Sequence, residues 1–455
     1  VNLIMEDNEM NQKVTKREKL CYVLTNIGNV PVQAILGSYL LIFYTNIVGL
    51  NPASCATLFL IARILDGLND PIVGFVIDHR KVSKMGRFRP TLMLGAVLCG
   101  LNFLLLWMGP YMATGGKLAI AYISYLLIGI IFPIMDISLN SMLPVMTEDP
   151  AERNSLSSIK GITLLLGVFE INIIAPILIG DASKAEGYIT VIIVATAIIV
   201  ICSLLGSLGL KERVRVKTGQ EKYEFKNLFD IIRQRPVWAT FLCALLYTTG
   251  TYIVNASNTF FYTYVLNNLM LLSLASMLQM LAMVPASIIA PFLIKKIGKK
   301  NAYIVGLFCF GIFPIVRFIN VTNIPILMIA TVVAGFGAGL AMPLQYGIQA
   351  DNTDYIELKL GYRAEGAVAS LSSFITKCAM GIGGAIPGYV LALVHFDSTT
   401  MIQTSMVNNM IIFCTVGSPV IFCCLAIVVF KLGYPITKEK LEEQNIDLKE
   451  LHHNL

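Results

Sequence analysis

Runs of about 20 apolar residues recur along the whole chain and constrain its fold more than any other feature. Each run is long enough to cross a hydrocarbon core of roughly 30 Å as a helix. Inside lipid the backbone must satisfy its own hydrogen bonds, which favours helices for runs of this length. Twelve runs are counted, near 20–45, 52–78, 91–109, 118–143, 158–180, 188–210, 237–265, 270–294, 302–320, 324–349, 364–394 and 410–432. The sequence therefore predicts an all-α integral membrane protein with 12 transmembrane helices.

The composition and the placement of charge agree with this prediction. Only 14% of the 455 residues are charged, while 56% are hydrophobic, unlike the usual soluble domain. Of the 34 Lys and Arg residues, 28 fall on the side of the N-terminus, 2 on the other side (Lys117 and Lys184) and 4 within helices. Cytoplasmic loops carry the excess of Lys and Arg, so both termini are expected in the cytoplasm of a multi-pass plasma-membrane protein. The net charge of +6 then needs no nucleic-acid partner.

The chain divides around its longest charged loop into two halves of six helices. The tetrapeptide SLSS occurs at 155–158 and again at 370–373, and Gly86 and Gly298 are 212 positions apart in corresponding loops. Two similar offsets indicate a duplicated unit, as in transporters built from repeats. The predicted parts are a cytoplasmic segment, two six-helix bundles joined by a linker, and a cytoplasmic tail: 1–19, 20–210, 211–236, 237–432 and 433–455.

Polar residues interrupt the second apolar run. Arg63, Asp66, Asn69 and Asp70 fall on one stripe of a helix because they are three or four positions apart. A charged residue at the bilayer centre costs about 2.5–3.5 kcal/mol, so this stripe must face partners, water or a cation. The interpretation favoured is a cation site; the alternative is an Arg63–Asp66 ion pair that only fixes helix packing.

Two prolines are expected to free backbone oxygens near these carboxylates. Pro71 and Pro133 lack the N–H that would bond to the carbonyls of Gly67 and Gly129. Such hard oxygens suit Na⁺ or Li⁺, whereas a proton needs only a carboxylate pair.

Further polar residues lie within the other apolar runs. The run 118–143 carries Asp136 and Asn140, and the run 158–180 carries Lys160 and Glu170. Lys377 lies 13 residues into the run 364–394, roughly 20 Å deep, which is too far for its ammonium group to extend to the membrane interface. We expect Lys377 to face a carboxylate or a substrate.

Several classes of function find no support in the sequence. The ten cysteines lie almost entirely in apolar segments without a CxxC pair, which predicts neither disulfides nor a metal site. There is no Walker motif, dinucleotide fingerprint, HExxH or nucleophile elbow, so the chain is not expected to be an enzyme, to use ATP or to hold a cofactor.

Five stretches and one lysine, in this order, resemble the glycoside-pentoside-hexuronide:cation symporter family of the major facilitator superfamily, which includes the melibiose permeases. The stretches are YTNIVGL (44–50), ARILDGLNDPIVGFVID (62–78), GRFRP (86–90), PIMDI (133–137), ADNTDYIELKLGYRAEG (350–366) and Lys377. The resemblance runs from about residue 20 to 395. It implies the major facilitator fold and symport of a sugar with Na⁺, H⁺ or Li⁺ by alternating access.

The same resemblance assigns roles to residues. It implies a cation site at Asp66 and Asp70, with Asn69 beside them and Asp136 as a sugar-contacting or ion-linked group. Arg63 is expected, from its spacing alone, to form a packing ion pair with Asp66. The substrate-binding positions expected are Asp136, Asn140, Lys160, Gln345 and Lys377. The pattern also implies a cytoplasmic charge latch between the runs 52–78 and 91–109, formed by Asp78, Arg80, Arg87 and Arg89.

The chain departs from the melibiose permeases where the sugar binds. Val30 replaces an acid of helix 1, and Asn140 and Met342 replace two tryptophans. Pro133 replaces a threonine that helps to bind Na⁺, which favours H⁺, and Gly161 replaces an arginine, with Lys160 next to it.

A glycoside, a pentoside or an acidic sugar stays open as substrate. Two alternatives stay open as well, a lysolipid or other amphiphile as cargo and a sensor that transports nothing. The protein is expected to act as a monomer.

Overall fold

The computed structural model describes residues 14–79, 83, 85–147, 150–213, 230–361 and 365–453. Every regular element in these ranges is helical, and the only bridge between extended residues is the isolated pair Ser83 and Gly86. The predicted all-α class is therefore confirmed. Contacts divide the chain into two units, Val1–Gly219 and Gln220–Leu455, called below the N-terminal and C-terminal units.

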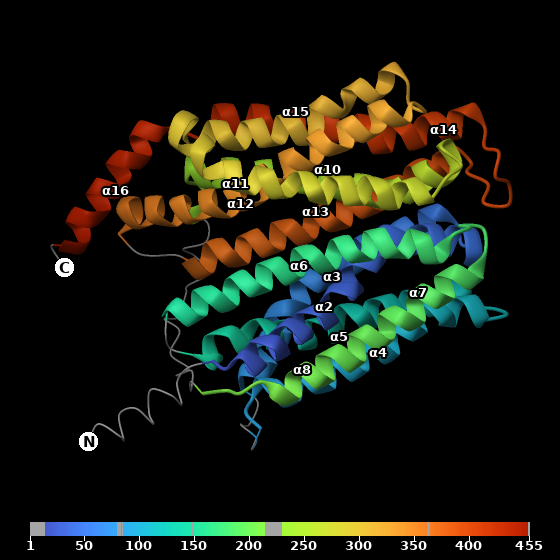
Figure 1. Ribbon diagram of the computed structural model, residues 1–455, viewed down its shortest axis with the longest axis horizontal. Coiled ribbons are helices and arrows are strands. Elements are labelled where there is room, and N and C mark those ends of the chain that lie inside the picture. Colours follow the sequence, from blue (N-terminus) through green and yellow to red (C-terminus); the bar gives the residue numbers. More distant parts are fainter. Residues whose placement is uncertain are drawn as a thin grey trace. The chain divides into compact units, whose positions relative to one another are not determined.

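The N-terminal unit is a bundle of long helices that run side by side (Figure 1). Its elements are α2 (Lys16–Ile42), η1 (Phe43–Val48), α3 (Pro52–His79), α4 (Phe88–Met112), α5 (Lys117–Met146), α6 (Pro150–Ile179), α7 (Ala185–Ala197), η2 (Ile198–Cys202) and α8 (Ser203–Gly209). A capping box starts α2, in which Thr15 and Glu18 bond to each other's backbone N–H. Helices α2, α5 and α6 pack against one another, and α3 packs along α5.

The C-terminal unit repeats this pattern of long helices. Its elements are α10 (Arg235–Phe260), η3 (Phe261–Val265), α11 (Met270–Leu307), η4 (Phe308–Ile312), η5 (Phe313–Ile319), α12 (Ile324–Leu360), α13 (Glu365–Leu393), α14 (Ser405–Ile412), η6 (Phe413–Gly417), α15 (Ser418–Gly433) and α16 (Lys438–His453). Helix α12 continues past the predicted end of its apolar run at 349.

Nine runs in the described ranges are long and apolar enough to span a membrane. One of them, Met270–Ile319, includes two predicted spans. Gly298 separates these spans, because its φ of 79° and ψ of 161° interrupt α11. Helices α3 and α6, of 28 and 30 residues, are not among the nine. The chain is thus a multi-pass membrane protein, and the count of twelve spans stays a prediction.

Two features recur at matching positions in the two units. Gly86 and Gly298, the two glycines singled out by the sequence, both have positive φ, at 101° and 79°. In addition, π-helical segments replace part of the first and sixth spans of each unit: η1 and η3 start at Phe43 and Phe261, while η2 and η6 start at Ile198 and Phe413. The last two are 215 positions apart, the same offset as the repeated SLSS. These matches support the duplication.

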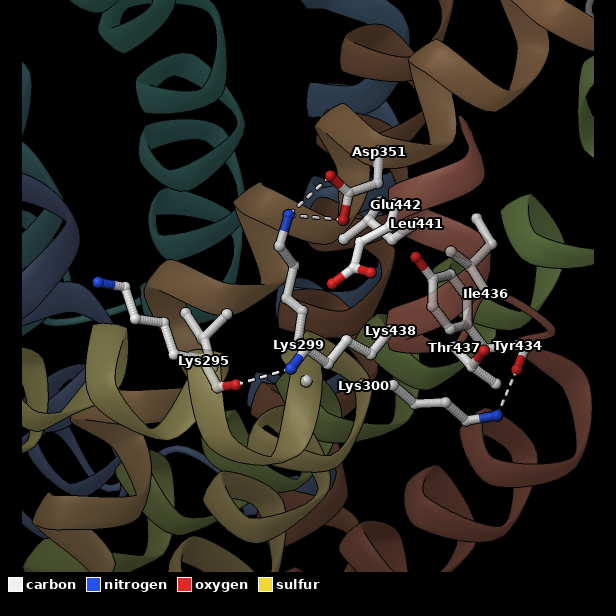
Figure 2. Close-up of a pocket in the computed structure, with 12 residues that line it drawn as sticks. Lys295, Lys299, Lys300, Asp351, Tyr434, Ile436, Thr437, Lys438, Leu441 and Glu442 are labelled. Carbon is white, nitrogen blue, oxygen red and sulfur yellow. Dashed lines mark hydrogen bonds and ion pairs between the residues drawn. The ribbon is translucent and has the colours of Figure 1, made fainter. Parts of the chain in front are cut away.

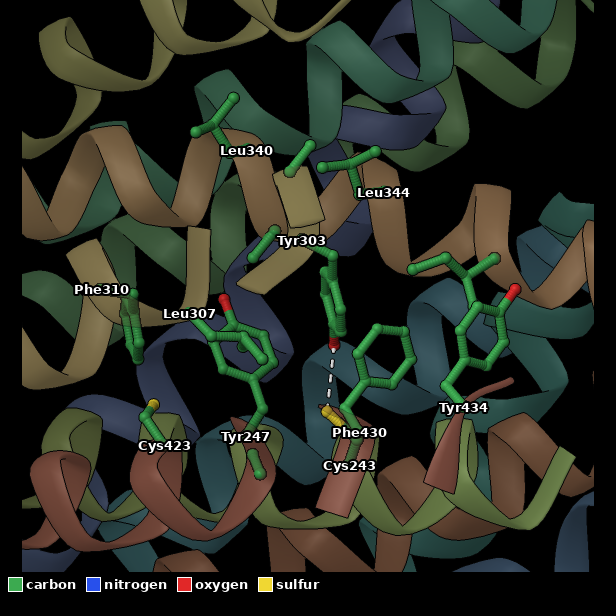
Figure 3. Packing of buried hydrophobic residues seen from close by; sticks show 14 of the residues in the cluster. Cys243, Tyr247, Tyr303, Leu307, Phe310, Leu340, Leu344, Cys423, Phe430 and Tyr434 are labelled. Atoms are coloured by element: carbon green, nitrogen blue, oxygen red, sulfur yellow. Dashed lines mark hydrogen bonds between the residues drawn. The ribbon is translucent and has the colours of Figure 1, made fainter. Parts of the chain in front are cut away.

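Aromatic and small residues form the core of the C-terminal unit (Figure 3). Tyr247 meets Phe310 edge to face, with ring centroids 5.1 Å apart, and Phe430 stacks on Tyr434 at 4.6 Å. Alanine and cysteine fill the spaces between these rings, for example Cys423, which is fully buried. Small residues let helices approach closely, which is how helices associate within a membrane.

The terminal helix α16 packs against the C-terminal unit (Figure 2). The Lys438 ammonium donates to the carbonyl of Lys295 at 3.0 Å, and Gln444 donates to the carbonyl of Asp351 at 2.8 Å. Asp351 itself forms an ion pair with Lys299 at 2.6 Å. The charged tail expected after residue 433 is therefore a docked helix.

Gly86 generates a prediction about the turn before α4. The Glu212 carboxylate accepts the backbone N–H groups of Arg87, Phe88 and Arg89 at 2.8, 2.8 and 2.9 Å, so it caps the helix. A Cβ at Gly86 would overlap this carboxylate, and the positive φ adds strain. We expect Gly86→Ala to lower the free energy of unfolding by about 1–3 kcal/mol, seen as a lower melting temperature in detergent.

Gly115→Ala is the matched control, because nothing lies within 4 Å of its added Cβ. Equal melting temperatures for the two variants would contradict this role of Gly86.

Candidate functional site

The buried charges of α3 form an ion pair. An Nη1 atom of Arg63 lies 2.9 Å from Oδ2 of Asp66, and both side chains are only 12% exposed. The other guanidinium nitrogen, Nη2, donates to Oε1 of Gln33 on α2 at 3.4 Å. The pair that the sequence offered as a structural alternative is therefore present, and it links α3 to α2.

The second oxygen of Asp66 lies against α5. A Cβ at Gly129 would overlap Oδ1 of Asp66, so the carboxylate fits only because residue 129 is a glycine. One turn away, Asn69 donates to the carbonyl oxygen of Gly129 at 3.0 Å. Pro133 leaves this carbonyl without its helical partner, as the sequence predicted. The amide of Asn69 takes its place, and a carbonyl has a second lone pair for another ligand.

A second polar network joins three helices around Asp136. Oδ1 of Asp136 accepts from Asn29 of α2 at 2.9 Å, and Oδ2 accepts from Asn140, one turn further along α5, at 3.0 Å. The ammonium of Lys160 on α6 donates to the amide oxygen of Asn140. Three residues predicted to bind substrate, Asp136, Asn140 and Lys160, are thus in contact.

The two networks are separate. Asp66 meets α5 at Gly129, seven residues before Asp136, which corresponds to two turns and about 10 Å along the helix. Within the described ranges no group of three His, Cys, Asp or Glu side chains comes together as a metal site. Both networks contact α2 and α5. A shift of either helix at one network would therefore also move residues of the other.

Some predicted positions lie outside what the structure describes. The side chains of Asp70, Asp78 and Glu170 and the whole of Arg80 belong to this group. The cation site at Asp66 and Asp70 and the latch around Asp78 stay predictions for that reason. In the C-terminal unit, Gln345 on α12 and Lys377 on α13 are both half-buried.

The latch arginines that are described hold helix ends in the N-terminal unit. Arg89 donates from Nε to the carbonyl of Ser207 at 3.0 Å and from Nη2 to that of Leu208 at 2.8 Å. These carbonyls are at the C-terminal end of α8, where cations interact favourably with the helix dipole. The backbone N–H of Arg87 belongs to the Glu212 cap.

Two contributions to the site were missed by the sequence argument. The argument considered Val30, which is buried against Gly167 of α6, whereas its neighbour Asn29 reaches Asp136. Tyr125, one turn before Gly129 on α5, lies beside both charges of the Arg63–Asp66 pair. A signal for Asn29 was available, because Asn26 and Asn29 are both amides within the first apolar run.

Comparisons with known proteins identify the family of the chain. The family described as MFS/sugar transport protein matches residues 21–438. The chain is 30% identical over 383 residues to an isoprimeverose transporter of Lactiplantibacillus pentosus, covering 82% of this chain and 80% of the relative. It is 29% identical to a glucuronide carrier protein homolog of Escherichia coli K12, covering 96% of each.

Solved structures share the fold. A bacterial homolog of the human lysosomal transporter Spinster, in an inward-facing and unoccupied conformation, has a TM-score of 0.68 at 12% identity. The alignment covers 94% of this chain and 97% of that structure. At this identity the likeness shows the fold alone.

Gly129→Ala tests the contact of Asp66 with α5. The added methyl group would push the carboxylate away from α5 and strain the bond from Asn69, and overpacking of this kind costs about 1–3 kcal/mol. We expect a lower melting temperature in detergent. Gly37→Ala on α2 is the control, since nothing lies within 4 Å of its Cβ. If the two variants melt alike, Asp66 does not depend on the space at residue 129.

A double-mutant cycle tests the coupling between Asp136 and Lys160. Either Asp136→Leu or Lys160→Leu leaves a charge in the membrane without its counterpart. We expect the loss of unfolding free energy in the double variant to be smaller than the sum of the two single losses, by about 0.5–3 kcal/mol. Additive losses would show that the network through Asn140 carries no coupling.

Proposed function

Because the chain belongs to the family of MFS/sugar transport proteins, we propose that it transports a sugar by symport with a cation. Transport would proceed by alternating access, in which the substrate pathway opens to one side of the membrane at a time. The observation that carries the proposal is the polar network of Asn29, Asp136, Asn140 and Lys160, built by three membrane helices of one unit.

The chemistry of this network suits a sugar with an acidic or hydroxyl-rich ring. A carboxylate and two amides bind hydroxyl groups in both directions, as donors and as acceptors. Lys160 adds a positive charge that would attract the carboxylate of a hexuronide. The relatives named as carriers of isoprimeverose and of glucuronide support a glycoside or a hexuronide as substrate. In the C-terminal unit, Gln345 and Lys377 stay candidates for substrate binding on the basis of the sequence.

The coupling cation would bind at Asp66 and Asp70. Oδ2 of Asp66 is engaged by Arg63, while Oδ1 lies next to α5 at Gly129. The carbonyl oxygen of Gly129 and the side chain of Asp70 would supply further oxygen ligands for Na⁺ or Li⁺. For H⁺, the carboxylate pair alone would suffice. In this proposal Asp136 responds to the cation through α5, rather than binding it directly.

The remaining parts of the proposal concern orientation and gating. Both termini would be cytoplasmic, as the distribution of Lys and Arg indicates. The protein would act as a monomer in the plasma membrane. Asp78 and Arg80, with Arg87 and Arg89, would form the latch that holds one orientation closed. The amphiphile and the sensor are not favoured, because the named relatives carry sugars and Asp66, Asp70 and Asp136 are all retained.

Uptake into proteoliposomes tests symport. Labelled glycosides, pentosides and hexuronates are offered to wild-type protein under an imposed Na⁺ gradient and, separately, under an imposed H⁺ gradient. We expect one gradient to drive accumulation above the external concentration. Asp66→Asn and Asp70→Asn should remove accumulation, because the driving ion no longer binds, while downhill equilibration of the sugar continues.

Asp181→Asn serves as the matched control, since Asp181 lies outside the membrane helices in a pair with Lys184. Lys160→Gln in the same assay should raise KM for hexuronates much more than for neutral glycosides. Accumulation by wild-type protein under neither gradient, with folded protein in the vesicles, would overturn the proposal.

A further inference from the structure

Arg317 is a second buried cation, in the C-terminal unit, and the proposed transport mechanism does not use it. The residue belongs to η5, within the apolar run Met270–Ile319, and is only 9% exposed. Its Nη2 donates to the hydroxyl of Thr331 on α12 at 2.7 Å. Thr331 in turn donates to the carbonyl of Leu327, so it is a neutral partner.

No acid compensates this charge within the ranges that the structure describes. The ion pairs found there are Lys19–Glu152, Arg63–Asp66, Lys184–Asp181, Arg213–Glu18 and Lys299–Asp351, and none includes Arg317. The Nε atom of Arg317 is buried and has no hydrogen-bond partner. A guanidinium in this state is costly, because buried charges are ordinarily paired and fully bonded.

A small cavity lies beside the guanidinium. Its volume is about 60 Å³, and its lining includes Arg317, Thr331, Asn258, Ser276 and Gln279. The side chains of Asn258, Ser276 and Gln279 make no hydrogen bond to any residue in the described ranges. Among the side chains that line the cavity, Nε of Arg317 is the buried polar atom without a hydrogen-bond partner, and the polar groups of Asn258, Ser276 and Gln279 are available beside it to bind a ligand.

We propose that this cavity binds a small inorganic anion of the size of chloride. An anion would supply the missing countercharge for Arg317 and would accept hydrogen bonds from Nε and from the amide and hydroxyl donors. The volume has room for a few water-sized particles, at roughly 10–15 Å³ each. None of the residues proposed to bind the sugar lines this cavity, so the anion site is distinct from the proposed substrate site. The five polar lining residues named above come from α10, α11, η5 and α12, so the anion would hold these elements together.

Bromide, which is a close substitute for chloride, tests the site directly. Crystals of the full chain grown in or soaked with sodium bromide should show an anomalous peak in contact with the Arg317 guanidinium. In solution, replacing gluconate by chloride or bromide at constant sodium should raise the melting temperature of the wild-type protein, because a ligand that binds only the folded state stabilises it. Arg317→Gln should lose this shift.

Two further variants separate binding from folding. Gln279→Leu removes a donor from the cavity and keeps the cation, so it should require a higher chloride concentration for the same shift, about tenfold for each 1.4 kcal/mol lost. Lys184→Gln removes a positive charge outside the membrane helices and should keep the wild-type shift. Absence of both the anomalous peak and the halide shift in wild-type protein would mean that water alone fills the cavity, and would overturn the proposal.

Discussion

The Arg63–Asp66 ion pair is the interaction on which the arrangement of the N-terminal unit depends. Once two charges are placed in the middle of α3, neighbouring helices must supply partners, because lipid supplies none. Gln33 on α2 meets the guanidinium, and the glycine at position 129 of α5 makes room for the carboxylate. Removing one member of a buried pair costs about 3–5 kcal/mol, since the other charge stays behind. The pair therefore fixes how α2, α3 and α5 pack.

The same pair shapes the proposed cation site. Because Arg63 already neutralises one oxygen of Asp66, the site does not carry the full repulsion of two bare carboxylates before a cation arrives. The net negative charge that attracts the cation is therefore smaller than that of two unpaired carboxylates, so the cation is bound less tightly and can be released. Arg317 presents the opposite case. It has no carboxylate partner in the described ranges, and its Nε has no hydrogen-bond partner, which leads to the proposed anion.

Much of the fold was predictable because local rules determine it. Hydrophobic runs gave the helices, and the spacing of three between Arg63 and Asp66 gave their ion pair. Pro133 correctly indicated a released carbonyl at Gly129. Contacts between helices were harder to predict from the sequence. Asn29 reaching Asp136 and Glu212 capping α4 join residues more than 100 positions apart, and no local periodicity encodes such pairs. For Asp70 and Asp78 the sequence is still the only guide.

The π-helical segments have a consequence for the history of the chain. A π turn contains one more residue than the α-helix around it. A single-residue insertion into an ordinary helix is therefore enough to create one. Such segments occupy the first and the sixth span of each unit, and η2 and η6 are separated by the same 215 positions as the repeated SLSS. Independent insertions would not be expected to keep this register. For η2 and η6 the shared offset is what one insertion made before a duplication would leave. The segments η1 and η3 are 218 positions apart, and η4 has no π-helical counterpart in the described part of the N-terminal unit, so these need separate insertions or deletions.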